Sequence, residues 1–282
     1  MIDDLFIPFY SATYSRKYLT DQYEANKVSQ AKTKSYQVCS SFMYHLQHGQ
    51  LYFNQGTHSP IEIKPVLLFY GAVQLLKACI LTRDPNYPEN SQVLAHGVTT
   101  RKRKKATYRF LEDEVKIQKN GLFSHFLDKM FHMKHLEGEK YQMVTLLQHI
   151  ADMHPLFKRL TKNSLSYKAK LQNNTVLMSQ EILDGYHMTV NRFEQFLETN
   201  TTAKDSKNVK VQEEKNNIKI LFSKLPPRWT SQPWLYDITG DMYLLKNREQ
   251  VHSYQLPELA SHFLLLYNLS MICRYEAEWW GI

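Results

Sequence analysis

The sequence predicts an α+β protein, with a mainly helical core formed by N- and C-terminal helices and a β-rich insertion between them. Apolar residues recur at three- and four-residue steps in the first ninety positions and again after position 257, which is typical of helices packed on a core. Between 164 and 247 they alternate instead, as in strands with one buried face. With 282 residues, 43% of them hydrophobic, the chain can bury a substantial core.

Two long helices are expected near the N-terminus. An apolar stripe predicts the first, about 25 residues long. Its members are Tyr36, Cys39, Met43, Leu46, Gln50 and Phe53. The capping-box pattern of Ser59-Pro-Ile-Glu62 predicts the second over about 61–82. This helix is apolar on nearly every side and should be central, and Pro65 either kinks it or marks its true start.

A cationic run follows within positions 94–123. It consists of Arg101, Lys102, Arg103, Lys104 and Lys105, preceded by His96-Gly97. After it, Tyr108 and Phe110 on one side, and Val115 and Ile117 nearer the Asn120-Gly121 pair, predict a β-hairpin with an Asn-Gly turn. From 124 to 160 the pattern is helical again. We therefore expect a helical domain over 1–163.

The segment 164–250 is expected to be rich in strands. Alternation predicts strands at Tyr167–Leu171, Val176–Met178, Met188–Val190, Ile218–Phe222 and Trp234–Ile238. A short helix is expected through Phe193 and Leu197, and Thr239-Gly240-Asp241 predicts a hairpin turn. The polar stretch 200–217 predicts a mobile surface loop. A last helix within 251–282 should pack back on the second long helix.

Composition and charge exclude some classes of protein. The net charge of +8 favours an anionic partner. Cys39, Cys79 and Cys273 have no metal-ligand spacing and predict free buried thiols in a reducing compartment. The N-terminus lacks the pattern of a signal peptide, and no apolar run reaches the roughly 20 residues of a membrane span. We expect a cytoplasmic protein without a membrane partner.

Several segments together resemble the YaaC-like family of Bacillus and related Firmicutes. They are Ser59-Pro60, the helix 67–78, Ala95–Lys105, Glu114–Phe123, His132–Lys140, and the closing Arg274-Tyr275 and Trp279-Trp280-Gly281. Genes of this family tend to lie beside the gene for IMP dehydrogenase, so the resemblance implies a regulatory partner of that enzyme in purine nucleotide metabolism. It carries no settled activity and implies no cofactor.

The paired long helices are also faintly similar to HEPN-type domains of RNA-cleaving toxins. Fold alone does not carry function. HEPN nucleases have an Arg followed by four to six residues and a His, whereas Arg248 and His252 have three residues between them. Nuclease activity is therefore not expected.

Two interpretations of the cationic run remain open. It is either a solvated charge run or an anion site that holds phosphates through charge-assisted hydrogen bonds, with His96 beside it. Thr99 and Thr100 would cap a following helix and expose its amides to the anion. A nucleotide, an RNA backbone or an acidic protein face would each satisfy this charge.

Other candidate sites have weaker signals. His132 and His135, with Glu137 and Glu139, have the spacing of a metal site, but no metal is expected because such histidines are common on helices. Glu112 and Glu114 would point the same way on a strand and could act as acid and base, but we expect them to face solvent or to pair with nearby lysines; His96 with Glu114 is a candidate catalytic pair. No catalytic residue is assigned.

The aromatic C-terminus has two interpretations. Trp279 and Trp280 either fold back on the core or, together with Arg274, form a candidate interface. The sequence thus predicts a non-catalytic interaction or regulatory protein with an anionic partner, and an RNA- or nucleotide-binding protein is the alternative.

Overall fold

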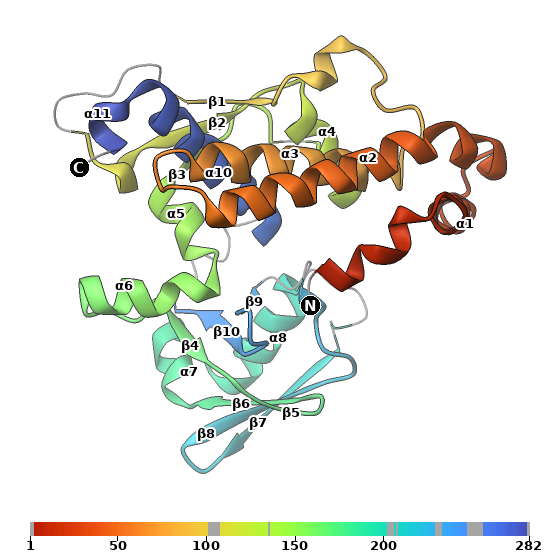
Figure 1. Ribbon diagram of the computed structural model, residues 1–282. Helices are drawn as coiled ribbons and strands as arrows, with labels where there is room; N and C mark the ends of the chain where they lie inside the picture. The colour runs from red at the N-terminus through yellow and green to blue at the C-terminus, as the bar shows by residue number, and fades with distance from the viewer. Residues whose placement is uncertain are drawn as a thin grey trace. The chain divides into compact units, whose positions relative to one another are not determined.

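The computed structural model describes residues 3–100, 108–134, 136–201, 206, 208–228, 233–246 and 256–280. The chain divides into two units, Met1–Met143 with Phe263–Ile282, and Val144–His262. The first unit joins the N-terminal helices to the C-terminal helix, and the second contains most of the strands (Figure 1). The predicted α+β class, with N- and C-terminal helices in one core, is confirmed.

The first unit is built on two long helices, α2 (Ala31–His58) and α3 (Lys64–Leu81), which lie side by side. Their backbones approach closely because glycines face large side chains: a Cβ added at Gly71 would lie 2.9 Å from Phe53 Cδ2. The helix α1 (Ala12–Ala25) packs on α2. The prediction that Tyr36 belongs to the buried apolar stripe is wrong. Tyr36 is 70% exposed and lies against the Arg16 guanidinium.

The start of α3 differs from the capping-box prediction. The Ser59 hydroxyl donates to the carbonyl oxygen of Gly56, so Ser59 closes α2 rather than capping the next helix. The helix α3 begins at Lys64, with Pro65 in its first turn, where a missing N–H costs nothing. Pro65 therefore marks the true start of this helix. Nine of its residues are buried, which confirms its central position.

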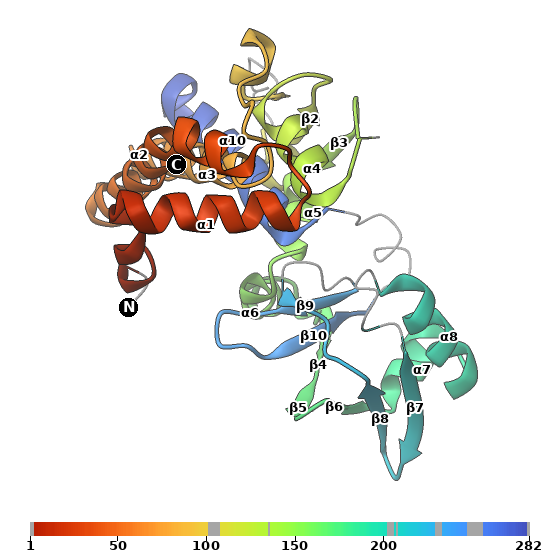
Figure 2. The ribbon, with the colours of Figure 1, turned by 90° about the vertical axis from the view of Figure 1, so that its right-hand side faces the viewer.

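The C-terminal helix α10 (Glu258–Tyr275) packs against α3, as predicted. The ring of Phe69 lies 5.3 Å from that of Phe263 and 5.5 Å from that of Tyr267. Phe263 also stacks on Phe123, with 5.0 Å between the ring centroids. The two views in Figures 1 and 2 show α10 beside α3. Aromatic packing therefore joins segments nearly two hundred residues apart.

A small antiparallel sheet lies in the same unit, in the order β1 (Val98–Thr100), β2 (Glu114–Ile117) and β3 (Lys140–Gln142). The predicted hairpin at Asn120-Gly121 is wrong, because Gly121 caps α4 (Leu122–Phe131) instead. Leu122 and Phe123 donate their N–H groups to Ala95 and His96. The cause is local: Leu122, Phe123, Phe126 and Leu127 are buried at helical spacing.

Short helices complete the two units. In the first unit they are η1 (Asp3–Leu5), η2 (Ile7–Tyr10), η3 (Ser91–Leu94), η4 (Phe110–Glu112) and α11 (Ala277–Trp280). In the second they are η5 (Ala151–Met153), α6 (His154–Thr161), α7 (Glu181–Tyr186) and α8 (Val190–Asn200). The helix α5 (Met143–Gln148) begins at the division between the units.

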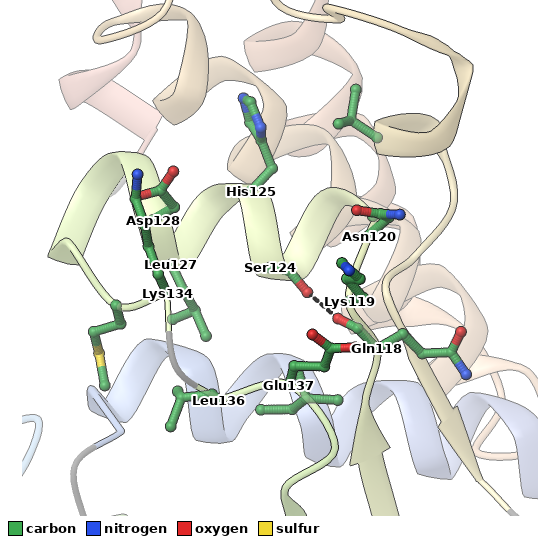
Figure 3. A pocket seen from close by; sticks show the side chains of 14 residues that line it. Gln118, Lys119, Asn120, Ser124, His125, Leu127, Asp128, Lys134, Leu136 and Glu137 are labelled. Carbon is green, nitrogen blue, oxygen red and sulfur yellow. Dashed lines mark hydrogen bonds and ion pairs between the residues drawn. The ribbon is translucent and has the colours of Figure 1, made fainter.

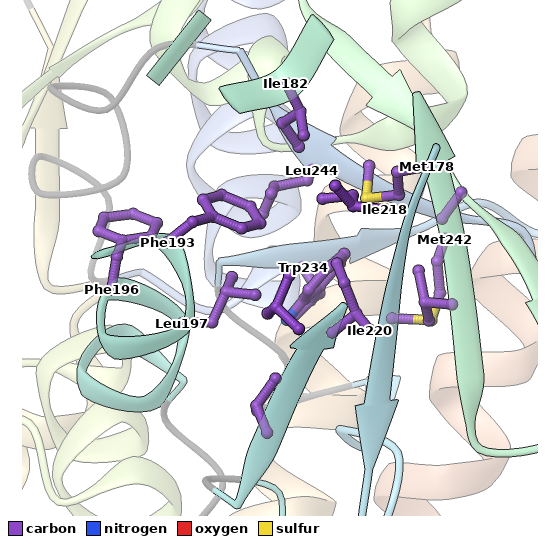
Figure 4. Packing of buried hydrophobic residues seen from close by; sticks show 14 of the residues in the cluster. Met178, Ile182, Phe193, Phe196, Leu197, Ile218, Ile220, Trp234, Met242 and Leu244 are labelled. Carbon is purple, nitrogen blue, oxygen red and sulfur yellow. The ribbon is translucent and has the colours of Figure 1, made fainter. Parts of the chain in front are cut away.

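The second unit contains two antiparallel sheets. One has the order β5 (Lys170–Gln172), β6 (Thr175–Ser179), β8 (Asn217–Phe222) and β7 (Val209–Glu214). The other has the order β4 (Ser166–Lys168), β10 (Met242–Leu245) and β9 (Trp234–Tyr236). Figure 4 shows how Ile218, Ile220 and Trp234 pack with Phe193 and Leu197 of α8. The predicted β-rich segment is therefore present, with α7 and α8 covering its core.

Three predictions for this unit are wrong. The strand expected at Tyr167–Leu171 is two strands in different sheets, joined at Ala169, whose N–H donates to Met242. The strand expected at Met188–Val190 is absent, because Val190 begins α8. The loop expected at 200–217 contains β7, where Val209 and Val211 alternate as buried residues with exposed neighbours.

Among the described residues, α3 is the one helix that is long and apolar enough to cross a membrane. Its residues are largely buried within the helical unit, which is the pattern of a core helix. The three cysteines are free, as predicted, and lie in α2, α3 and α10.

Candidate functional site

The structure places part of the predicted anion site. His96, Thr99 and Thr100 are described, whereas Arg101, Lys102, Arg103, Lys104 and Lys105 lie outside the described residues. Thr99 and Thr100 lie in β1, and the helix expected to follow them falls outside the described residues. The two threonines pair with Lys116 and Val115 in the β1–β2 ladder, because both segments are extended and neighbouring.

The two residues on either side of segment 101–107 reach the same buried pair of side chains. Thr100 Oγ1 donates to Asn268 Oδ1 at 3.1 Å, and the Tyr108 hydroxyl donates to Asp113 Oδ2 at 3.1 Å. Asn268 Nδ2 in turn donates to Asp113 Oδ2 at 3.0 Å. Burial raises the pKa of Tyr108, and the charge of Asp113 acts in the same direction, so this hydroxyl stays a donor. Both ends of the basic segment are therefore tied to α10.

His96 lies in an aromatic cage. Its ring centroid is 5.0 Å from that of Phe69, 6.2 Å from that of Tyr70 and 6.0 Å from that of Tyr267. The Nδ1 atom is buried and has no hydrogen-bond partner. Burial lowers the pKa of His96, and the charges of Arg274 and Lys77 lower it further. His96 is therefore held neutral between α3 and α10, with two cations nearby.

Lys77 is a residue that the sequence analysis missed. It is the one charged residue of α3 after Lys64, in a helix otherwise filled with apolar side chains. Burial lowers the pKa of its ammonium group. The sequence did contain a signal for Lys77, namely a single cation within an otherwise apolar helix. Burying such a charge costs desolvation free energy, and packing of the core does not need it, so another role is indicated.

The candidate interface at the C-terminus is partly described. The Trp280 Nε1 group donates to the carbonyl oxygen of Ile61 at 3.1 Å, which ties this tail back to the α2–α3 connection. Arg274 folds along its own helix, where Nε donates to Ser270 O at 2.9 Å. The side chain of Trp279 lies outside the described part of the structure.

A cavity of about 290 Å³ opens beside α4 (Figure 3). Gln118, Lys119 and Asn120 line one side, and Ser124 and Asp128 of α4 line another. The floor is apolar, and Lys134 Nζ lies 3.6 Å from Asp128 Oδ1. Two of the segments that carry the family resemblance, 114–123 and 132–140, meet here. The lining has equal numbers of lysines and carboxylates, so its charge does not select one class of ligand.

A buried charge network surrounds Asp84. His125 Nε2 lies 3.1 Å and Lys129 Nζ 2.9 Å from Asp84 Oδ2, and the same ammonium is 3.1 Å from Glu89 Oε1. The spacing would allow a metal ion here, since the possible ligand atoms of Asp84, Glu89 and His125 all lie within 4.8 Å of one another. Lys129 already bridges the two carboxylates, which does not suit a second cation at this position. The network therefore fits an ion-pair cluster that joins α4 to the end of α3.

The two glutamates considered for acid–base chemistry do not share a strand. Glu112 lies in η4 and pairs with Arg109, whereas β2 begins only at Glu114. Glu114 pairs with Lys140 at 3.7 Å. His132 ends α4 with a positive φ of 57°, and His135 lies outside the described residues.

The comparisons with known proteins give one match. The family model described as YaaC-like Protein matches residues 7–282, which is nearly the whole chain and includes both units. Neither the curated proteins nor the solved structures give a match.

Proposed function

This chain belongs to the YaaC-like protein family, and from that premise we propose that it is a non-catalytic, cytoplasmic interaction protein. It engages an anionic partner through the basic segment between Thr100 and Tyr108. Five consecutive cationic residues repel one another unless solvent or an anion offsets their charge, so this segment is the strongest candidate for contact.

The observation that supports the proposal most is the anchoring of both ends of this segment. Thr100 and Tyr108 contact Asn268 and Asp113, two buried residues that contact each other. The two residues that flank the segment are therefore held at one place in the helical unit, which favours a defined point of contact for a partner.

IMP dehydrogenase is the partner that we propose, because genes of this family tend to lie beside the gene for that enzyme. An acidic face of the enzyme, or a nucleotide bound at its surface, would supply the negative charge. Electrostatic complementarity of this kind mainly raises the association rate and the specificity.

Co-purification from cell lysate tests the proposal. The wild-type chain should recover IMP dehydrogenase, and the Lys102/Arg103/Lys104→Ala variant should recover at least tenfold less. The matched control is Lys17/Lys32/Lys158→Ala, which removes the same charge from three exposed positions. Equal recovery by both triple variants, or no recovery by the wild type, contradicts the proposal.

Binding of RNA or nucleotide phosphates is the second candidate, because the same cations suit a phosphate backbone. It predicts an affinity for single-stranded RNA that falls steeply with salt, on a log–log slope close to the number of phosphates contacted. Nuclease activity is not proposed, because the Arg–His spacing of HEPN enzymes is absent from the sequence.

A further inference from the structure

Two cationic side chains, Lys77 and Arg274, share one face of the helical unit with the neutral imidazole of His96. His96 lies between Tyr70 of α3 and Tyr267 of α10. Lys77 follows Tyr70 by seven positions and Arg274 follows Tyr267 by seven, which is about two helical turns in each case. Residues seven apart share a helix face, so Lys77 and Arg274 lie on the same faces as the rings that hold His96.

Lys77, His96 and Arg274 form a row rather than a compact group. The helices α3 and α10 are antiparallel, because Tyr267 lies beside Phe69 whereas Cys273 contacts the backbone of Val66. Lys77 and Arg274 are therefore displaced from His96 in opposite directions, by roughly 10 Å of helix rise each before the length of the side chains is counted.

The row has no compensating acid within the described part of the chain. Lys77 has no ion pair there, and burial is the cause of its lowered pKa. The Arg274 guanidinium has no carboxylate partner there: it contacts Ser270 O, Ser270 Oγ and Met271 Sδ, and lies 5.2 Å from the centroid of the Tyr275 ring. Partly buried cations without a counter-charge are unfavourable, so a bound anion would offset a real electrostatic cost.

We infer that Lys77, His96 and Arg274 bind a ligand that carries two phosphate groups. Arginine and lysine are the usual donors to phosphate, and the separation along the row requires more than one anionic group. The His96 Nδ1 atom is enclosed by aromatic rings without a partner, and a buried acceptor is tolerated better than a buried N–H. The proton therefore belongs on Nε2, which donates to the ligand. The inference goes beyond the proposed function, because these residues lie outside the basic segment that the proposed function assigns to the protein partner.

The half-buried position of these groups favours a small oxyanion over a protein surface. Lys77, His96 and Arg274 are all intermediate in exposure, so a carboxylate on a flat partner face would reach them poorly. Inorganic diphosphate is the simplest probe with the required chemistry, and inorganic phosphate serves as the comparison with one anionic group.

Calorimetric titration of the full chain tests the inference. Diphosphate should bind at least tenfold more tightly than phosphate, and Lys77→Gln and Arg274→Gln should each weaken diphosphate binding at least tenfold. Lys32→Gln is the matched control, since Lys32 is exposed on α2, and its affinity should equal that of the wild type. Equal affinities in all variants, or no binding of diphosphate at millimolar concentration, overturn the inference.

Two further measurements keep the result interpretable. Diphosphate should shift the NMR resonances of the His96 ring in the wild type, and the absence of a shift overturns the inference even if a variant fails to fold.

A single-stranded RNA oligonucleotide distinguishes the source of the phosphates. If RNA binds more tightly than diphosphate, and if Lys77→Gln and Arg274→Gln abolish RNA binding, the row recognises a nucleic-acid backbone. That outcome would overturn the small-ligand inference.

The Lys102/Arg103/Lys104→Ala variant separates this inference from the proposed function. It should lose the protein partner and retain most of its diphosphate affinity. Diphosphate binding by a wild-type chain that recovers no IMP dehydrogenase would refute the proposed function alone. Partner recovery without diphosphate binding would refute the phosphate site alone.

Discussion

Asn268 Nδ2 lies 3.0 Å from Asp113 Oδ2, although 155 positions separate the two residues in the sequence. Asn268 is fully buried on α10, and Asp113 precedes β2. The same amide accepts a hydrogen bond from Thr100. One side chain therefore links the C-terminal helix to both ends of the basic segment, since Tyr108 contacts Asp113.

Replacing Asn268 should destabilise the helical unit. Asn268→Ala leaves the buried Asp113 carboxylate with one donor fewer and removes one of the two acceptors near the Thr100 hydroxyl, the other being Glu114 O, so the free energy of unfolding should fall by about 1–3 kcal/mol. Asn54→Ala, at an exposed position on α2, should change it far less. Urea unfolding measures both variants, and equal losses would show that the buried network adds no stability.

The Asp84 network should make stability sensitive to acid. Burial acts to raise the pKa of Asp84, but hydrogen bonds from His125 and Lys129 outweigh it and hold the pKa well below its ordinary value. Because the folded-state pKa is depressed, the stabilisation is present above the unfolded pKa of about 3.9 and is lost as the pH falls below it.

Asp84→Asn should therefore unfold more easily at neutral pH, by roughly 1–3 kcal/mol, because it weakens the charge-assisted hydrogen bonds that the buried carboxylate accepts from His125 and Lys129. The difference from the wild type should shrink as the pH falls below about 4. Asp21→Asn, at an exposed position on α1, is the control for loss of a carboxylate. A constant difference between wild type and Asp84→Asn across this pH range would contradict the assigned pKa shift.

His149 should produce a second pH dependence at higher pH. Burial lowers the pKa of His149 to about 3, and the charge of His154 acts in the same direction. An unfolded histidine titrates near 6.5, so the unfolded state binds the proton first as the pH falls. Stability is then lost from about pH 6.5 downwards, by up to about 1.4 kcal/mol per pH unit.

His149→Asn should flatten this loss between about pH 6.5 and 5, although it also disturbs the hydrogen bond to Ser261 Oγ. His58→Asn, at an exposed position, should leave the pH dependence as it is in the wild type. The free energies of unfolding of the three proteins at several pH values decide the matter. An unchanged slope in His149→Asn would rule out this residue as the cause.

Two glycines with positive φ provide a matched pair of substitutions. A Cβ at Gly121 would collide with the backbone of Gly97, whereas a Cβ at Gly138 would meet no atom within 4 Å. Gly138→Ala should cost only the backbone strain, about 1–2 kcal/mol. Gly121→Ala should cost roughly 3 kcal/mol or more, because β1 and α4 must also move apart. Thermal unfolding compares them, and similar losses would mean that the close approach of Gly97 is not required.

Long elements with a single period were predictable from the sequence. The apolar spacing of α2, α3 and α10 arises from residues within a few turns of one another, so the local pattern carries it. The same holds for β8 and for the turn at Gly240, whose positive φ favours glycine. Short or polar elements were less predictable: β3 has only three residues, and the buried Val209 and Val211 of β7 lie in a stretch that is otherwise polar.

The candidate site was predictable only in its parts. His96 and Arg274 each carried a signal of charge or family resemblance, but nothing in the local sequence places them near each other or near Lys77. The Asn120-Gly121 pair shows the reverse problem. A hairpin turn and a helix start both accept this dipeptide, and the burial of Phe123 and Phe126 against other segments decided between them.

The sequence by itself determined the fold class, the long helices, the free cysteines and the cationic run, because each depends on composition or on neighbours along the chain. Only the tertiary structure decided that Thr100 and Tyr108 share the Asp113–Asn268 pair, and that the His96 ring lies against rings of α3 and α10. The reason is physical: contacts between distant residues depend on how helices and strands pack, and that packing minimises the free energy of the whole chain rather than of any segment.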